Sequence, residues 1–443
     1  MSEKTAEFKE KNGSSRVTEI LRRFLNSSTT GGVLLLIAAV AAMIIANSGA
    51  REWYEHFLHS HFAIGNLDKS VHFWVNDALM VIFFFVVGLE IKREILVGEL
   101  SSVRQAMLPV VAAVGGMIVP ITIFFILNGN EPGSEGWGIP MATDIAFAIG
   151  ILSLLGKRVP LSLKVFLTAF AIVDDMGAVI VIAIFYSSKI GWVALGVAAA
   201  LLLLLFYLGK KGYHNRFAFL ITGLIVWYLF LKSGVHTTIA GVLLALTLPI
   251  KSKFSKENFV EKTSEELNNL KESFQEKQKA FTHNQLERLG KLTRHANDLI
   301  NPLQWYENKL HKFTMLIIMP IFAFVNAGVY VGGVEGALFE GLSFSIILGL
   351  FLGKLIGVFS FSWLSAKAKI ASLPANSRWK DMVGIALLGG VGFTMSLFIA
   401  NLSYEGGSAL LDQAKIGILS ASGIAAVVGL LYLSFVLPKK KAK

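Results

Sequence analysis

Runs of apolar residues limit what this chain can fold into more than any other feature of its sequence. Most of these runs are about 17 residues or longer, so as helices they can cross a hydrocarbon core of about 30 Å. Only 16% of the residues are charged, whereas a soluble domain carries about 25%. These runs exclude a soluble enzyme, a protein with a single anchor, and an outer-membrane barrel, whose strands would be about ten residues long and alternate in hydropathy.

Hydropathy predicts an all-α membrane protein with twelve transmembrane helices. Because twelve is even, both termini lie on one side, and most of the 41 Lys and Arg residues then fall in segments on that side. The positive-inside rule makes that side the cytoplasm, so the net charge of +11 faces anionic lipid head groups and indicates no nucleic-acid partner. The expected spans are roughly 31–47, 76–92, 105–127, 138–156, 160–186, 190–208, 217–231, 235–250, 313–331, 342–364, 382–401 and 414–437.

Charged segments outside the predicted spans divide the chain further. In the segment 251–312, apolar residues are spaced by three and four, as at Leu286, Leu289 and Leu292. This spacing predicts one or two amphipathic helices, which serve as a linker or as a regulatory or partner-binding element. The expected parts are a cytoplasmic segment 1–30, spans one to eight in 31–250, this cytoplasmic insertion at 251–312, spans nine to twelve in 313–437, and a basic cytoplasmic tail at 438–443.

The outside segment 48–75 is rich in histidine, with Gly65-Asn66 as a hairpin turn. His59 and His61 could bind a metal, but no third ligand converges with them in the sequence. An oligomer contact or a surface cap is the favoured interpretation. The chain has no cysteine, which excludes disulfides, a thiol nucleophile and a thiolate metal site.

Five charged residues inside the predicted spans require an explanation, because a charge at mid-bilayer costs about 2.5–3.5 kcal/mol on insertion scales. They are Glu90, Asp144, Asp174, Asp175 and Lys354. An ion pair that staples two helices would account for Lys354 and one of the adjacent aspartates, which point about 100° apart on a helix. It would leave the second aspartate unpaired in a low-dielectric setting, where it is protonated or ligated. We therefore favour a site that handles ions or protons.

Two spans carry helix-weakening residues at matching places. The fourth span contains Pro140 followed by Thr143 and Asp144, and the eleventh contains a glycine cluster. In a membrane, freed backbone is tolerated where it lines a cavity or is buried in protein, although glycines also serve helix packing alone. Spans three to five and ten to twelve enter from opposite sides, so they form inverted-topology repeats, an architecture of secondary transporters.

At these residues the chain resembles the NhaA family of bacterial sodium/proton antiporters, which is itself an example of that architecture. The resemblance covers about residues 75 to 437 and implies twelve helices, two of them interrupted and crossing near mid-membrane. The segments that carry it are Val87–Glu94, Ala142–Ala148, Ile172–Ala178, Ser233–His236, Phe322–Gly328, Gly353–Lys354 and Gly392–Phe398.

The resemblance implies a role for each candidate residue. Asp174, Asp175, Asp144 and Thr143 match the positions that bind cation and proton, with Na⁺ at Asp175 and Asp174. Lys354 matches a charge-balancing lysine that pairs with an aspartate, with Asp174 favoured. Glu90, Arg93, Glu94, His236, Glu307 and His311 match residues linked to pH regulation, although a structural role for either histidine stays open. The second interrupted helix contains Gly389, Gly390, Gly392 and Thr394.

The expected function is therefore secondary active export of Na⁺, and of Li⁺ as well, in exchange for H⁺, without a cofactor or enzymatic activity. The resemblance further implies electrogenic, pH-regulated exchange in a bacterial inner membrane and a homodimer formed through 48–75. A sodium-coupled symporter of organic solutes is the alternative; an intramembrane aspartyl protease, a nucleotide-driven pump and a channel are less favoured. Asn308 and Leu355 depart from the family pattern, which has a second histidine and commonly a proline there, and the insertion is longer than in compact members.

Overall fold

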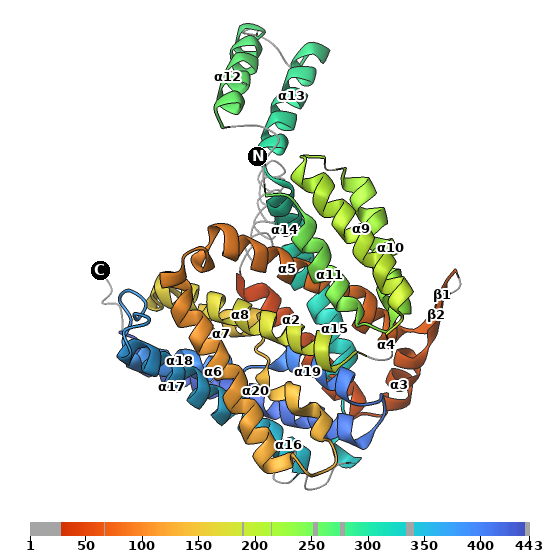
Figure 1. The fold of residues 1–443 in the computed structure, drawn as a ribbon, viewed down its shortest axis with the longest axis vertical. Coiled ribbons are helices and arrows are strands. Elements are labelled where there is room, and N and C mark those ends of the chain that lie inside the picture. The colour runs from red at the N-terminus through yellow and green to blue at the C-terminus, as the bar shows by residue number, and fades with distance from the viewer. Residues whose placement is uncertain are drawn as a thin grey trace, which may run out of the picture. The chain divides into compact units, whose positions relative to one another are not determined.

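The computed structural model describes residues 28–65, 67–187, 190–213, 215–250, 256–274, 280–333 and 341–438 (Figure 1). Most of the expected segment 1–30 and of the tail 438–443 lies outside these residues. The described chain is mainly helical, with two short strands.

The elements before the insertion are α2 Ser28–Ala46, α3 Arg51–His59, β1 His61–Ile64, β2 Leu67–Ser70, α4 Val71–Phe73, η1 Trp74–Leu79, α5 Met80–Val97, η2 Glu99–Ser101, α6 Val103–Asn128, η3 Ser134–Met141, α7 Ile145–Leu154, η4 Gly156–Arg158, α8 Leu161–Phe185, α9 Trp192–Lys210, α10 Arg216–Ser233 and α11 Thr237–Thr247. Those that follow are α12 Lys256–Glu272, α13 His283–Leu299, α14 Pro302–Phe313, η5 Thr314–Ile318, α15 Met319–Asn326, η6 Val331–Gly333, α16 Gly341–Leu348, η7 Gly349–Gly353, α17 Lys354–Lys367, α18 Trp379–Gly389, α19 Phe393–Ser403 and α20 Ala409–Val436.

Ten helical segments within the described residues are long and apolar enough to cross a membrane, or eleven if α2 and α3, bent by 115°, count as one span. The expected total of twelve is therefore not confirmed. The difference lies at the predicted span 235–250, where α11 has only 11 residues. At 1.5 Å per residue such a helix is about 16 Å long, short of the hydrocarbon core of about 30 Å.

The chain divides into two compact units, each with its own core. The first comprises Met1–Met80, Glu94–Tyr186 and Phe313–Lys443, and the second comprises Val81–Arg93 and Ser187–Lys312. Buried apolar side chains of α6, α7, α8, α17, α18 and α20 form a core in the first unit. In the second unit, side chains of α5, α9, α10, α11 and α14 do the same.

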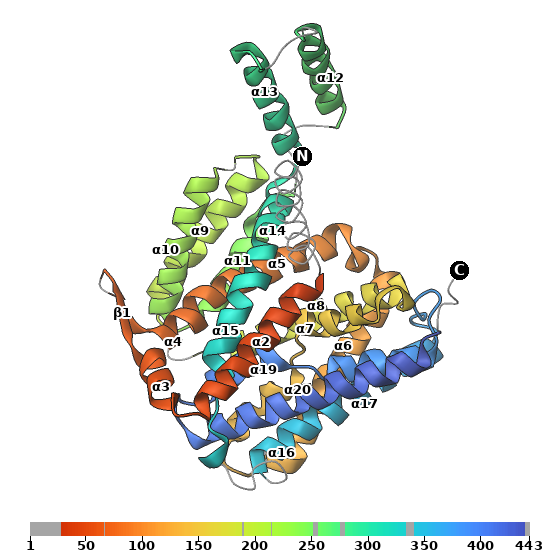
Figure 2. The ribbon, with the colours of Figure 1, turned by 180° about the vertical axis from the view of Figure 1, so that it is seen from behind.

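Glycine allows two helices of the first unit to pack backbone against backbone. A Cβ placed on Gly357 of α17 would lie 2.2 Å from the carbonyl oxygen of Gly115 in α6, and one on Gly353 would lie 2.7 Å from the Cα of Pro120. Small residues at helix interfaces permit such close approach in membranes. The same unit places α2 beside α15, as Figure 2 shows. Because α17 packs closely on α6, its first residue, Lys354, is buried inside this unit.

The described residues of the insertion 251–312 contain α12, α13 and nearly all of α14, where the apolar spacing predicts one or two helices. α12 and α13 lie side by side (Figure 1). Arg288 of α13 donates to Glu266 of α12 with an N–O distance of 3.2 Å, and the side-chain amide of Gln285 donates to the carbonyl of Ser273. Thr282 caps α13 in a capping box with Gln285.

The histidine-rich segment 48–75 contains the predicted hairpin. β1 and β2 pair antiparallel, with Ala63 opposite Asp68, and Gly65 supplies the positive φ of the turn; Asn66 lies outside the described residues. The indole N–H of Trp74 donates to the carbonyl of Phe62. The Nδ1 of His61, which the sequence suggests as a possible metal ligand, lies 3.2 Å from Oδ1 of Asp68.

Candidate functional site

Residues 142–144 are not helical and separate η3 from α7; we call them the first break. Pro140 in η3 has no backbone N–H to donate, and Ala142 and Asp144 have extended backbone with ψ of 144° and 98°. Asp144 then starts α7 as its N-cap, because its Oδ1 accepts a hydrogen bond from the backbone N–H of Phe147 at 2.9 Å. A carboxylate therefore lies at the point where the helix is broken.

The second break separates α18 from α19 at residues 390–392. A Cβ on Gly392 would lie 2.8 Å from the carbonyl oxygen of Ala142 and closer still to the hydroxyl of Ser396, so glycine is required by the packing there. Thr394 follows in the first turn of α19. The glycines expected to weaken this span thus occupy a position where another backbone comes close.

The two breaks contact each other directly. The backbone N–H of Asp144 donates to the carbonyl of Val391 at 2.7 Å. The hydroxyl of Thr143 donates to the carbonyl of Gly389 at 2.8 Å, which satisfies a carbonyl freed at the C-terminal end of α18. Each break therefore supplies hydrogen-bond partners for backbone groups that the other leaves without a helical partner.

The Asp144 carboxylate joins the N-termini of two helices. Its Oδ1 accepts from Phe147 in α7, while its Oδ2 accepts from the backbone N–H of Thr394 at 3.1 Å and from the Thr394 hydroxyl at 2.6 Å. Each helix N-terminus carries roughly half a positive charge, so the two together compensate one carboxylate. Asp144, which is 1% exposed, is thus electrostatically balanced where it lies.

The adjacent aspartates lie near the middle of α8, where they meet Lys354. The Nζ of Lys354 donates to Oδ2 of Asp174 at 2.7 Å, and both side chains are fully buried. This confirms the expected pair and assigns it to Asp174. Asp175 is also buried and lies close enough to Lys354 for an electrostatic interaction. Thr143 of the first break lies against the Asp174 carboxyl, which connects the ion pair to the breaks.

Oxygen atoms near this pair are the ones available to a cation, because hard cations take carboxylate, hydroxyl and carbonyl ligands. Among the described residues, no three His, Asp or Glu side chains are placed to hold one ion together. The three aspartates therefore do not form a ready-made cage, and the oxygens of Asp144 already accept from α7 and α19. A carboxylate has about four lone-pair sites, so Asp144 stays a candidate together with Asp174, Asp175 and Thr143.

The second unit brings four of the residues linked to pH together as two ion pairs. The Nδ1 of His311 and Oε1 of Glu90 are 3.0 Å apart, and the Nε of Arg93 and Oε1 of Glu307 are 3.2 Å apart. His311 is about half exposed, whereas both glutamates are mostly buried. Glu90 and Arg93 lie on one turn of α5, and their partners lie about one turn apart on α14, so the two helices contact each other through these side chains.

Two other expected members are placed elsewhere. Glu94 belongs to the first unit, and its Oε2 accepts from the backbone N–H of Glu99 at 3.0 Å. His236 precedes α11, where its Nδ1 lies 2.8 Å from the Thr238 hydroxyl. Lys92, next to Arg93, instead donates to the carbonyls of Leu246 and Leu248 at the other end of α11. The Lys92 ammonium and His236 therefore lie at opposite ends of this helix, which is about 16 Å long.

Sequence reasoning missed two serines that hold the second break in place. The hydroxyl of Ser422 in α20 accepts from the backbone N–H of Phe393 at 3.1 Å. The hydroxyl of Ser396 donates to the carbonyl of Ile139 at 2.8 Å. Serine in an apolar helix carries no signal of its own in a sequence, since it often bonds within its own helix.

Comparisons with known proteins agree over most of the chain. A family model described as Na⁺/H⁺ antiporter 1 matches residues 22–433. The chain is similar to a protein named Na(+)/H(+) antiporter NhaA from Bacteroides fragilis, with 48% identity over 415 residues, 90% of this chain and 94% of that one. Proteins of the same name from Bacteroides thetaiotaomicron (44% identity, 96% and 100% covered) and, as NhaA 1, from Saccharophagus degradans (42%, 95% and 92%) are also similar.

The variant Thr394→Val tests how much the carboxylate of Asp144 depends on its donors. It keeps the side-chain volume and removes the hydroxyl that donates to Oδ2. A lost hydrogen bond to a buried charge costs about 1.5–3 kcal/mol, so thermal unfolding of the purified protein in detergent should occur at a lower temperature. Thr122→Val, on an exposed face of α6 where the hydroxyl bonds within its own helix, is the matched control; equal midpoints for both variants would contradict the assignment.

Proposed function

The chain belongs to the Na⁺/H⁺ antiporter 1 family, and from this premise we propose that it exchanges Na⁺ for H⁺ across a membrane at Asp174, Asp175 and Lys354. It is a multi-pass membrane protein of a transporter family. The observation that carries the choice of site is the fully buried pair of Lys354 and Asp174 with a second buried carboxyl next to it.

Charge balance explains why cation and proton compete at this site. With Asp144 compensated by two helix N-termini, Asp174, Asp175 and Lys354 leave one net negative charge when all are ionised. A single Na⁺ or a single H⁺ at Asp175 neutralises it, and an uncompensated charge in a low-dielectric interior is costly. The site therefore holds one or the other, and this competition is sufficient for exchange. Li⁺, a smaller cation with the same charge, fits the same ligands.

Electrogenic exchange follows if the ion pair also opens during the cycle. Na⁺ that takes oxygens from both Asp174 and Asp175 removes the partner of Lys354, and a buried ammonium without a partner gives up its proton. One proton from Asp175 and one from Lys354 then leave for each Na⁺ that enters, so the net charge of the site changes from zero to −1. Such coupled groups titrate as a set rather than one by one.

Alternating access would come from movement of the helices that carry the breaks. We place the two interrupted spans, η3 with α7 and α18 with α19, across each other near mid-membrane, with α11 as a short twelfth span. Thr143, Asp144, Gly389, Gly390, Gly392 and Thr394 hold the crossing together and offer backbone carbonyls to the cation. Support comes from the hydrogen bonds between the breaks and from the central positions of Asp174 in α8 and of Lys354 in the helical segment Gly341–Lys367.

Control by pH is assigned to the ion pairs of the second unit. His311 faces Glu90, with Glu307 and Arg93 beside it, and histidine is the side chain that ordinarily changes charge near neutral pH. Glu94 and His236 would act separately from these pairs, through the loop after α5 and the start of α11.

The remaining parts follow the same proposal. Both termini and the insertion 251–312 lie in the cytoplasm, and the protein resides in a bacterial inner membrane. A homodimer forms through 48–75, because all four residues of β1 are exposed, with Phe62 and Ile64 at 59% and 54%, and an exposed strand edge is a template for pairing with another chain.

Asp175→Asn should abolish Na⁺-driven proton movement in proteoliposomes, because an amide neither releases a proton nor supplies charge for the cation. The assay adds Na⁺ to vesicles with a pH gradient and no organic solute, which also separates an antiporter from a solute symporter. Glu405→Gln, an exposed carboxyl after α19, is the matched control and should exchange normally. Exchange retained by Asp175→Asn, in protein that inserts and purifies like wild type, would sink this assignment.

Lys354→Gln should lower the net charge moved for each Na⁺ toward zero, because the second proton no longer has a carrier. A voltage-sensitive dye and a pH dye, read together in the same vesicles, measure this ratio. Breaking a buried pair costs about 3–5 kcal/mol, so the double variant Asp174→Asn with Lys354→Gln, which keeps a neutral hydrogen-bonded pair, should be the more stable protein. An unchanged ratio of charge to Na⁺ in Lys354→Gln would show that the lysine carries no proton.

His311→Gln should make the activation of exchange between about pH 6 and 8 less steep, because the titrating partner of Glu90 is gone. Initial exchange rates across that range, at saturating Na⁺, measure the steepness. His295→Gln, in α13 of the same unit, is the control. Identical profiles for His311→Gln and wild type would remove this histidine from pH control.

A further inference from the structure

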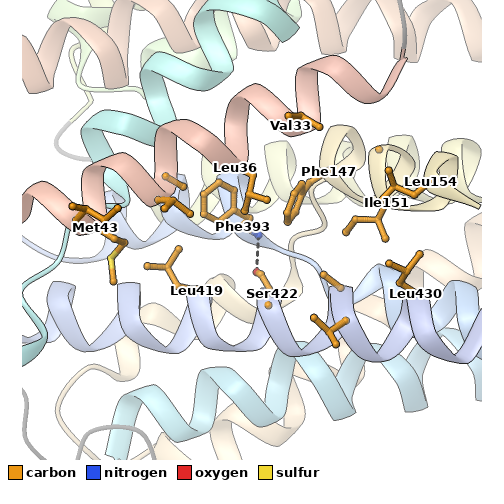
Figure 3. Close-up of a pocket in the computed structure, with 18 residues that line it drawn as sticks. Val33, Leu36, Met43, Phe147, Ile151, Leu154, Phe393, Leu419, Ser422 and Leu430 are labelled. Atoms are coloured by element: carbon orange, nitrogen blue, oxygen red, sulfur yellow. Dashed lines mark hydrogen bonds between the residues drawn. The ribbon is translucent and has the colours of Figure 1, made fainter. Parts of the chain in front are cut away.

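An apolar groove opens on the first unit beside the two breaks. It lies between α2, α7 and α20 and has a volume of about 470 Å³. In Figure 3, Phe147 and Phe393 occupy its middle, Met43 and Leu419 lie toward one end, and Leu154 and Leu430 lie toward the other. The side chains along it include Leu36, Ile44 and Val427, which are 49%, 64% and 57% exposed.

Glycines lie at the wall of the groove and in its open part. Gly32 of α2 and Gly150 of α7 pack on each other at the wall, where a Cβ on either would lie 3.7 Å from the Cα of the other. A Cβ on Gly423 of α20 would have no atom within 4 Å, so the open space lies beside this residue. The groove thus has space for a chain of hydrocarbon width along α20. Ser422 contributes a hydroxyl to its lining, but that hydroxyl accepts from the backbone N–H of Phe393 (Figure 3).

Two basic residues, Lys157 and Arg158, lie at the end of this groove next to Leu154 and Leu430. Near the other end Lys415, one turn before Leu419 in α20, is buried and interacts with Asp412. Lys157 follows α7 and is exposed. Arg158, next to it, donates to the carbonyls of Ser434 and Leu437 at the end of α20, the latter at 2.7 Å. These basic residues directly follow the apolar span Ser134–Leu154, which places them at a membrane boundary.

The geometry points to an anionic phospholipid as the occupant, with one acyl chain in the groove and its head group at Lys157. An apolar groove inside the hydrocarbon layer suits an acyl chain, and basic residues between membrane helices bind anionic head groups. Neither feature alone selects a lipid, but the two lie end to end along α7 and α20.

Such a lipid would touch the residues that position the candidate site. The Phe147 and Phe393 rings lie 5.8 Å apart in the groove. The backbone N–H of Phe147 donates to Asp144, and Phe393 precedes Thr394, which donates to the same carboxylate. The acyl chain therefore packs on the first turns of both helices that Asp144 joins. This inference concerns binding and holds whether or not the chain exchanges Na⁺ for H⁺.

The chain has no cysteine, so a single introduced thiol can report what lies in the groove. Gly423→Cys, labelled with a benzophenone maleimide and irradiated in vesicles of equal phosphatidylglycerol and phosphatidylcholine, captures the occupant for mass spectrometry. Gly196→Cys on α9, where a Cβ also meets no atom within 4 Å, is the matched control for bulk lipid. Val427→Cys provides a second probe position in the groove.

We expect phosphatidylglycerol adducts at position 423 to exceed those at 196 about fivefold relative to phosphatidylcholine, the factor that one basic residue near the surface contributes. Adding Lys157→Gln should remove the enrichment, and Lys210→Gln, an exposed lysine at the end of α9, should not. The proposal is overturned by bulk lipid ratios at both 423 and 427, by enrichment that survives Lys157→Gln, or by adducts to a peptide from residues 1–27 or from a second copy.

Discussion

Burying ionised groups inside a helix bundle is the condition on which the rest of this structure depends. Asp144, Asp174, Asp175 and Lys354 are all at most 1% exposed, and each buried charge requires a partner close by. Lys354 serves Asp174, and two helix N-termini serve Asp144. Lys354 also lies close enough to Asp175 for an electrostatic interaction, and the charges of Asp174, Asp175 and Lys354 add up to one negative charge when all three are ionised.

The breaks in two spans make this arrangement possible. A continuous helix uses all its central backbone groups internally, and a side chain cannot reach them. Breaking the helices at 142–144 and 390–392 frees N–H and carbonyl groups in the protein interior, where they bond to Asp144, Thr143 and each other. Glycine at 392 is needed because the two backbones approach too closely for a side chain. The charged site and the break are therefore one structural feature.

Particular residues show how far sequence reasoning reached. The buried lysine and adjacent aspartates were identifiable because charges are costly in apolar runs, and their pairing is confirmed at Asp174. The hairpin and the insertion helices α12 and α13 also followed from local signals. The place of Asp144 beside a cation stays a prediction, and its hydrogen bonds to α7 and α19 were not foreseen. The short α11 and the bend between α2 and α3 changed the span count, because hydropathy reports apolar length and not where a helix ends.

The sequence by itself determined the membrane class, the candidate charges and the places where helices weaken, since these depend on residue type and local spacing. Only the tertiary structure decided which aspartate meets Lys354, that Asp144 joins two helix N-termini, and that Ser422 and Ser396 hold the second break. It also separated His236 from the ion pair of His311 and Glu90. These partners lie tens to hundreds of residues apart, and the direction of a side chain across such a distance is set by packing of whole helices rather than by neighbouring residues.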